Sequence, residues 1–227
     1  MKRIIATLIL ISACSISLLA QNTETRSLDN FSAISIGEAI KLVLVPGNKN
    51  EAKIVADNID LDEIETRVSG SRLKIELTGN RYRNIEVEIT LTYKELEDLS
   101  VSSAARVKTK GAIKAEDFEV SVSSAGFARL EVDASMIDAD VSSSGELELE
   151  GKATSQRVGV SSAGVYDSYD MACEDTYVRA SSAGSAKVSA SKKIDAKASS
   201  AGSVKYRGNP DKVYVSASSG GSTSKSN

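Results

Sequence analysis

The chain has no histidine and no tryptophan, and aromatic residues make up only 4% of its 227 residues. A compact domain normally fills its core with more large rings, so we expect a thin core of stacked Val, Ala and Leu. Without histidine there is no imidazole base for a Ser or Cys nucleophile and no Cys/His zinc site. The sequence also lacks a calcium-binding glycine-aspartate nonapeptide and a phosphate loop. We therefore expect no catalytic residue, no cofactor and no metal ligand.

The chain also has no large excess of either charge and only two cysteines. Lys and Arg number 28 against 31 Asp and Glu, so the formal net charge of -3 provides no global basic field for nucleic acid. After export the chain would keep at most one thiol able to form a disulfide, that of Cys173, which excludes an intramolecular disulfide framework. Cys173 is either a reactive thiol or a small buried residue, and the absence of a histidine to activate it favours the second.

The first twenty residues differ from the rest of the chain. Lys2 and Arg3 precede an apolar run over residues 4–13, and small residues follow. This pattern predicts a secretory signal peptide, because the purely apolar run is too short to span a bilayer. Two processing sites compete: cleavage after Ala20, and lipidation of Cys14 in an Ile-Ser-Ala-Cys lipobox. Apolar residues continue beyond Cys14, which favours cleavage after Ala20; only the lipidated form would be attached to a membrane.

A Ser-Ser-Ala-Gly-like corner recurs seven times, starting at residues 102, 123, 142, 161, 181, 199 and 218. The starts are 18 to 21 residues apart, and a fixed period near 20 predicts a solenoid. Residues one and three positions before each corner are apolar and the one between them is mostly polar, which indicates a strand with one buried face. The predicted buried columns are Val101, Val122, Val141, Val160, Ala180, Ala198 and Ala217, and Leu99, Val120, Ala139, Val158, Val178, Ala196 and Val215. The outward row between them is Ser100, Ser121, Asp140, Gly159, Arg179, Lys197 and Ser216.

The corner itself reads as a packing device. We expect its glycines to supply backbone freedom at the turn without a clashing side chain, and its serine hydroxyls to bond to one another or to corner backbone groups. A row of nucleophilic serines is the alternative, but a base for them is missing. The corner glycines are Gly126, Gly145, Gly164, Gly184, Gly202 and Gly221. Past the corner, Tyr166 and Ser168 stand at inward positions of the fourth coil, where Tyr169, Met171 and Cys173 make the pattern irregular.

Residues 28–98 are rich in β-strand signals but not periodic. Turns are predicted at Pro46-Gly47 and Ser69-Gly70, and a helical turn within residues 57–66. The candidate strands cover residues 33–36, 40–45, 52–55, 64–68, 73–77 and 85–91. We interpret this part as the irregular first coils and cap of the same solenoid. The predicted organisation is therefore a single domain over residues 21–221, with seven regular coils over 99–221 and a polar tail over 222–227.

The stretches FSAISIGEAIKLVLVPGN, LKIEL and IEVEITL, which leads into LEDLSVSSAARV, resemble the putative auto-transporter adhesin, head GIN domain family. The marks are Phe31 and Ile34 at the opening, Gly37 after the first strand, and the Ser-rich corners. The resemblance covers about residues 28–221. It implies a right-handed parallel β-helix that Gram-negative bacteria export across the inner membrane; it implies no activity and no functional residues.

Charged residues on the outer faces suggest two further possibilities. A row that follows the corners would place Arg129 beside Glu148 and Asp167 beside Lys187 as weak exposed pairs. A carboxylate cluster for acid-base chemistry or Ca²⁺ is conceivable, although a solvated strand face explains the same pattern better. The carboxylates concerned are Glu131, Asp133, Asp138, Asp140, Glu146, Glu148 and Glu150.

Two functions remain open for such a chain. The first is an exported, adhesin-like, non-catalytic protein that binds a glycan, a cell surface or a protein partner through its outer faces, in the periplasm, at the outer membrane or outside the cell. The second is a polysaccharide lyase or hydrolase on the same scaffold. Three or more carboxylates and a base in one groove would favour the enzyme. We expect a monomer or a weak homo-oligomer and no nucleic-acid partner.

Overall fold

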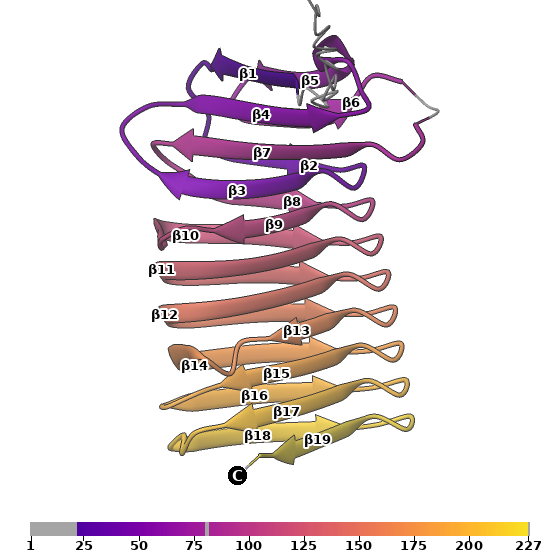
Figure 1. The fold of residues 1–227 in the computed structure, drawn as a ribbon. Helices are drawn as coiled ribbons and strands as arrows, with labels where there is room; N and C mark the ends of the chain where they lie inside the picture. Colours follow the sequence, from indigo (N-terminus) through magenta and orange to yellow (C-terminus); the bar gives the residue numbers. More distant parts are fainter. Residues whose placement is uncertain (1–21, 80–81, 227) are drawn as a thin grey trace, which may run out of the picture.

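A computed structural model of the protein describes residues 22–79 and 82–226. The chain forms a right-handed parallel β-solenoid, which confirms the fold class predicted from the corner spacing (Figure 1). The predicted signal peptide, with Ala20 and Cys14, lies outside the described residues. Within the described ranges, no helix is long and apolar enough to cross a membrane.

Each regular coil consists of a strand, a tight corner, a second strand and a wider bend at the opposite edge. The strands of these coils are β8 (Asp98–Val101), β9 (Arg106–Thr109), β10 (Ile113–Val122), β11 (Phe127–Val141), β12 (Glu146–Val160), β13 (Val165–Asp167), β14 (Met171–Ala180), β15 (Ser185–Ser189), β16 (Lys193–Ala198), β17 (Ser203–Arg207), β18 (Lys212–Ala217) and β19 (Ser222–Lys225). We call the outer surface of the segments before the corners the pre-corner face, and that of the segments after them the post-corner face. The pre-corner segments are residues 98–101, 117–122, 136–141, 155–160, 175–180, 193–198 and 212–217.

Successive coils stack in parallel register with an offset close to 19 residues. Val122 pairs with Val141, and the corners that begin at Ser123, Ser142 and Ser161 form one column, as predicted. The predicted Val, Leu and Ala columns are buried through the sixth coil. The seventh coil differs: Val215 is 47% exposed, because no further strand of the described chain packs on β18. β19 occupies most of the stretch predicted to be a polar tail.

The corner glycines confirm one half of the prediction: they avoid a side-chain clash, but they do not provide the left-handed backbone of the turn. The residues with left-handed backbone are the two before the glycine, such as Ser124 at φ 51° and Ala125 at φ 59°. The glycine is required by close approach, since a Cβ at Gly145 would lie 2.5 Å from the Val122 carbonyl oxygen of the preceding coil. The corner column is held by backbone hydrogen bonds, for example from Ala125 N to Ser143 O at 3.1 Å. No corner serine hydroxyl forms a hydrogen bond in the described residues, so the predicted hydroxyl ladder is wrong.

An eighth coil precedes the seven and has the same corner without its serines. β2 (Ala33–Ile36) and β3 (Lys41–Pro46) pair in parallel with β8 and β9. Between them Glu38 and Ala39 have φ values of 62° and 59°, and Ala39 N donates to Ser103 O at 2.8 Å. The sequence pattern missed this corner because it reads Gly-Glu-Ala-Ile and stands 65 residues before the next one.

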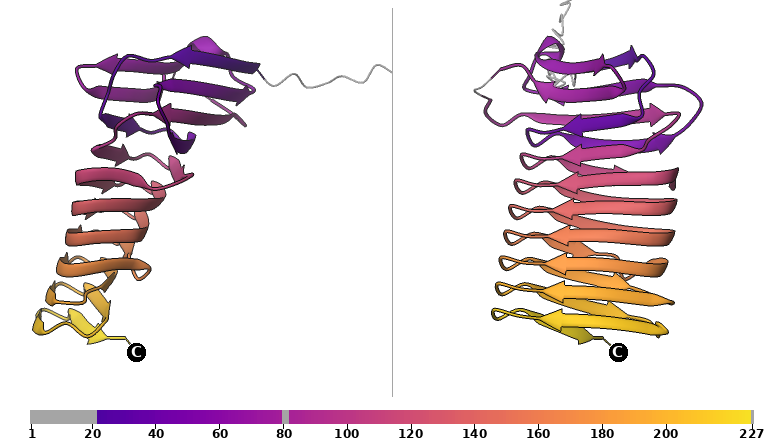
Figure 2. Two further views of the ribbon diagram at one scale, coloured as in Figure 1. Left: turned by 90° about the vertical axis from the view of Figure 1, so that its left-hand side faces the viewer. Right: turned by 180° about the vertical axis from the view of Figure 1, so that it is seen from behind.

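Antiparallel strands cover the N-terminal end of the stack (Figure 2). They are β1 (Asn22–Ser27), β4 (Glu51–Asp57), β5 (Ile64–Ser69), β6 (Arg72–Leu77) and β7 (Glu86–Tyr93), with the 3-10 helix η1 (Leu61–Glu63). The turn at Ser69-Gly70 joins the paired strands β5 and β6, and η1 is the predicted helical turn. The hairpin expected at Pro46-Gly47 is wrong, because β3 and β4 lie on opposite sides of β7.

Arg26 on β1 closes this cap. Its guanidinium donates to Ile64 O at 2.5 Å and to Leu61 O at 2.9 Å, and it forms an ion pair with Glu24. The first strand is therefore tied to the sheet that lies across the core from it, which stabilises the cap by charge-assisted hydrogen bonds.

The fourth coil carries one extra residue and a polar core. Between Glu148↔Asp167 and Gly151↔Met171, two residues of β12 face three of the next coil, which is a bulge. Inside it Gln156 is completely buried, and its side-chain oxygen accepts from Tyr166 Oη at 2.7 Å and from Ser168 Oγ at 3.2 Å. The Gln156 amide donates to Thr176 Oγ1 at 3.0 Å. This cluster replaces apolar packing with a hydrogen-bonded network, which has to be satisfied as a whole.

Candidate functional site

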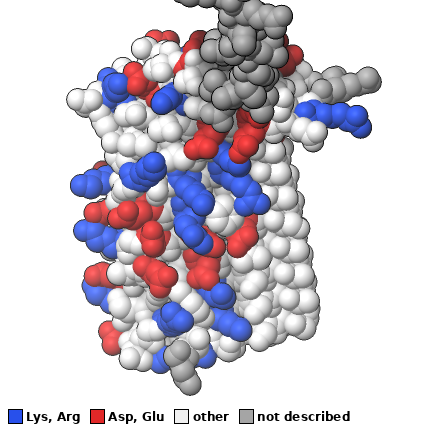
Figure 3. Space-filling view, viewed as in Figure 1, with Lys and Arg blue, Asp and Glu red and all other residues white. Residues whose placement is uncertain are grey.

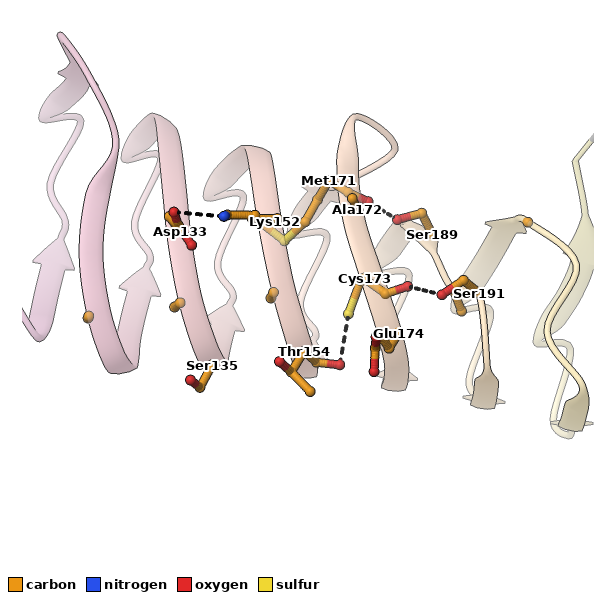
Figure 4. Close-up of a pocket in the computed structure, with 15 residues that line it drawn as sticks. Asp133, Ser135, Lys152, Thr154, Met171, Ala172, Cys173, Glu174, Ser189 and Ser191 are labelled. Carbon is orange, nitrogen blue, oxygen red and sulfur yellow. Dashed lines mark hydrogen bonds and ion pairs between the residues drawn. The ribbon is translucent and has the colours of Figure 1, made fainter.

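A groove of about 680 Å³ follows the bend edge from the second to the seventh coil (Figure 4). Its floor is a row of small side chains in register: Ala115, Ala134, Ala153 and Cys173. On its rim Lys152 pairs with Asp133 at 3.2 Å, and Ser191 Oγ donates to Cys173 O at 3.2 Å. The groove's polar groups thus bond to one another.

Cys173 is a buried structural residue. It is 4% exposed, and its thiol contacts Asp175 O at 3.3 Å. Burial raises the pKa of the Cys173 thiol, which disfavours the nucleophilic thiolate. The interpretation of Cys173 as a small core residue is confirmed.

The seven carboxylates singled out in the sequence do not form one cluster. Asp138 and Asp140 lie on the pre-corner face, whereas the five Glu and Asp residues of the β11–β12 ladder, Glu131, Asp133, Glu146, Glu148 and Glu150, lie past the corner. Glu148 is paired with Arg129, Asp133 with Lys152, and Asp138 with Arg157. Among residues 22–79 and 82–226 no group of three or more Asp, Glu, Cys or His is arranged to hold a metal ion.

The predicted charge row is present on the post-corner face. Arg129 forms an ion pair with Glu148, and Lys187 Nζ lies 2.9 Å from Asp167 Oδ2, which confirms both predicted pairs. Charges gather in bands across this face, while the corner side below the cap carries almost none (Figure 3). All four side chains are well exposed, so each pair contributes little stability.

A hollow of about 460 Å³ on the pre-corner face is the best candidate for a binding site. It opens where Gly159, on β12, lacks a side chain between Asp140 of the preceding coil and Arg179 of the following one. Long side chains of the next row, Asp138, Arg157, Tyr177 and Asp195, form its other wall. All these residues project from paired strands. The rim of the hollow is therefore held in place by the sheet, and no loop of the described chain contributes to it.

The hollow presents unpaired donors and acceptors. Arg157 Nη1 lies 3.4 Å from Asp138 Oδ2, but Asp140, Arg179 and Asp195 form no ion pair with any described residue. Tyr177 adds an aromatic ring, whose hydroxyl accepts from Lys193 Nζ at 3.1 Å. The hollow continues toward the corner, where Ser142, Ser161 and Ser181 border a neighbouring depression of about 430 Å³.

The surroundings of Asp140 disfavour its ionised form. Partial burial raises its pKa, and the nearby Asp138 carboxylate raises it further. A carboxyl whose pKa is raised by folding stabilises the fold when protonated, and that contribution is lost as the pH rises through the folded-state pKa. Ionised Asp140 therefore opposes folding at neutral pH.

We expect Asp140→Asn to raise the melting temperature at pH 7 and to leave it unchanged at pH 3, where Asp140 is already protonated. The measurement is thermal unfolding at both pH values. Asp138→Asn is the comparison: it removes the repulsion with Asp140 but also the ion pair with Arg157, so it should stabilise less than Asp140→Asn at pH 7. Equal gains for Asp140→Asn at both pH values would contradict this electrostatic origin.

The sequence contains one signal for this hollow. Gly159 stands in the outward row, whose other members are Ser, Asp, Arg and Lys. An outward glycine in a strand marks a place where the surface is open or something approaches closely. That signal shows where a hollow lies but not its depth, which depends on the side chains around it.

Comparisons with known proteins agree on the family and the fold. The family model described as "Putative auto-transporter adhesin, head GIN domain" matches residues 30–210, which confirms the resemblance of the opening strands and corners. No curated protein matches the chain.

Solved structures similar to this chain include putative adhesins and a putative lipid binding protein. A putative adhesin from Bacteroides fragilis superposes with a TM-score of 0.82 at 16% identity, over 91% of this chain and 96% of that one. A putative adhesin from Parabacteroides merdae gives 0.76 at 15% identity, with coverage of 91% and 96%. A putative lipid binding protein from Parabacteroides distasonis gives 0.70 at 19% identity, with coverage of 91% and 97%. At these identities the likeness concerns the fold alone.

Proposed function

Because the chain belongs to the putative auto-transporter adhesin, head GIN domain family, we propose that it is an exported, adhesin-like protein that binds a glycan in the hollow around Gly159. The family supports an adhesin-like role at the cell surface or outside the cell. The observation that carries the choice of ligand is the hollow itself, with its unpaired Arg179, Asp140 and Asp195 beside the ring of Tyr177.

This set of side chains suits a sugar. A glycan presents hydroxyls that both donate and accept, and Arg with Asp side chains can bond two of them at once. An aromatic ring supplies an apolar surface for the C–H face of a sugar while its polar edge stays hydrated. The lining of the hollow is mixed in charge, which favours a polar polymer over a buried apolar ligand.

The proposed export follows from the predicted signal peptide and the family. We propose cleavage after Ala20 and a mature protein in the periplasm or on the outer surface; lipidation at Cys14 would instead attach it to a membrane. We further propose that the protein is a monomer or a weak homo-oligomer.

Filling the hollow tests this function. We expect Gly159→Gln to abolish binding to the glycans that the protein retains on a glycan array, because the new side chain occupies the space between Asp140 and Arg179. A Cβ at Gly159 would lie 2.4 Å from Asp140 Oδ1, the movable end of a side chain, so the fold should tolerate the change.

The matched control is Ser121→Gln, which places the same side chain in the same outward row two coils nearer the N-terminus. It should bind like the unaltered protein, and melting temperatures would establish that both variants are folded. Loss of binding in both, or in neither, would contradict a site at Gly159.

One observation favours the carbohydrate-active enzyme as a second candidate. Three carboxylates, those of Asp138, Asp140 and Asp195, line the hollow together with two arginines, which meets the carboxylate part of the condition set by the sequence. The guanidinium groups stay protonated, so any base would have to be one of the carboxylates. Lyase and hydrolase assays on every glycan retained by the array would decide between the two. Turnover that disappears in Asp140→Asn would identify an enzyme; binding without turnover supports the adhesin-like role.

A further inference from the structure

Charge is distributed unevenly along the solenoid. Residues 171–227, which form the fifth to seventh coils, contain nine Lys and Arg and four Asp and Glu, a net charge of +5. Because the whole chain has a formal net charge of -3, residues 1–170 carry a net charge of -8. The small overall charge conceals a basic C-terminal quarter of the chain, which attracts anions locally.

On the pre-corner face of these coils the cations flank a column with two tyrosines. β14, β16 and β18 place Tyr177, Asp195 and Tyr214 in one row. On one side Arg179 stands next to Lys197, and on the other Lys193 stands next to Lys212. We call these seven residues the tyrosine column patch; its strands face the viewer in the right-hand view of Figure 2.

The four cations of the patch form no ion pair with any described residue, although Asp175 stands opposite Lys193 and Asp195 lies between the two cation pairs. These cations are Arg179, Lys193, Lys197 and Lys212; the eleven ion pairs of the described residues all occur elsewhere. Like charges directly opposite on neighbouring strands repel. An anion that lies between two such strands would remove this repulsion, so the arrangement favours a negatively charged ligand.

The tyrosines give the patch a second feature of a binding surface. Tyr214 is 56% exposed, and Lys193 Nζ lies 4.6 Å from the centre of the Tyr177 ring and 5.7 Å from that of Tyr214. Lys193 is therefore held between the rings by cation–π contacts. Tyr177 and Tyr214 lie in one row two coils apart, so their strands are about 9.6 Å apart along the solenoid axis.

We propose that the tyrosine column patch binds the acidic groups of a linear polyanionic glycan that lies along the solenoid axis. Arg179 borders both the patch and the hollow at Gly159, so one chain can occupy both. Within each of the two cation pairs the side chains project from neighbouring strands about 4.8 Å apart. An extended polysaccharide advances by a similar distance for each sugar. A carboxylate on successive sugars then meets a cation on successive strands. This inference rests on the proposed function and specifies its ligand class.

The test uses the full chain and two probes that differ only in charge: oligogalacturonate and its methyl ester. We expect isothermal titration to show binding of the acid, loss of that binding as salt is raised, and at least tenfold weaker binding of the ester. Arg179→Gln/Lys197→Gln should weaken binding of the acid by about tenfold or more, because each cation provides a charge-assisted hydrogen bond.

The matched control is Lys187→Gln/Lys205→Gln, which removes the same charge from the same two coils on the post-corner face. It should bind the acid like the unaltered protein, and equal weakening by both double variants would overturn a specific patch. Equal binding of acid and ester, or binding of double-stranded DNA through Arg179 and Lys197 as tightly as the acid, would overturn the anionic-glycan assignment.

Failure of this inference can be told apart from failure of the proposed function. If the array retains neutral glycans through the hollow and neither probe binds, the function stands and the anionic ligand is wrong. If no glycan of any kind binds, both are wrong.

Discussion

Gly151→Ala is expected to lower the free energy of unfolding by about 3 to 4 kcal/mol, one of the two largest effects of a single substitution foreseen in this chain. Two causes add at this position. Gly151 has φ 112°, a conformation that alanine adopts only with strain. Its Cβ would also lie 2.2 Å from the Val132 carbonyl oxygen, a backbone atom that cannot move without breaking the ladder between β11 and β12.

Gly70→Ala separates the two causes. Gly70 also has positive φ, at 61°, but nothing lies within 4 Å of the place its Cβ would take. That substitution should cost only about 1 kcal/mol, the price of left-handed backbone alone. Chemical denaturation followed by circular dichroism measures both. Equal losses in the two variants would show that the close approach at Gly151 contributes nothing.

The second large effect concerns the buried polar cluster of the fourth and fifth coils. We expect Gln156→Leu to destabilise the protein by about 2 to 4 kcal/mol, although leucine has a similar volume and is apolar. The reason is the partner left behind: Tyr166 is completely buried, and its hydroxyl donates only to Gln156 Oε1 among the described residues. A buried hydroxyl without an acceptor costs more than the hydrogen bond itself contributes.

Removing that hydroxyl as well provides the control. Gln156→Leu/Tyr166→Phe should regain a large part of the lost stability, because no orphaned donor remains at Tyr166. The four proteins form a double-mutant cycle measured by urea denaturation. Strictly additive losses from the two single substitutions would contradict the coupling between these side chains.

Most of the regular solenoid could be predicted from its sequence, because every coil repeats the same local chemistry. The buried columns, the stacked corners and the Arg129–Glu148 pair all follow from aligning the chain on its corners. The same alignment contained the polar cluster: Gln156 stands two residues before the inward Val158 and has to face the core. Its hydrogen-bond partners come from neighbouring coils, which no single repeat reveals.

The N-terminal part and the candidate site depended on information that no repeat contains. The first corner uses Gly37 and Glu38 in place of serines, since only the backbone conformation is essential there. The strand order of the cap arises because β7 lies between β3 and β4, a long-range choice that local turn signals do not specify. The depth of the hollow at Gly159 depends on the lengths and directions of side chains on four coils, which a single repeat does not contain.

The two ends of the stack also determine how the molecule would respond to a pulling force. Asn22 and Lys225 lie in strands at opposite ends, so tension between them acts along the axis, in line with the hydrogen bonds that join one coil to the next (Figure 1). At one end Arg26 locks the first strand across the cap; at the other, β18 has a partner on one side only. Under this load we expect the coils to unfold one at a time from the C-terminal end while the N-terminal cap stays folded. A cell held through such a protein would be released gradually, by lengthening of the tether, rather than by a single rupture.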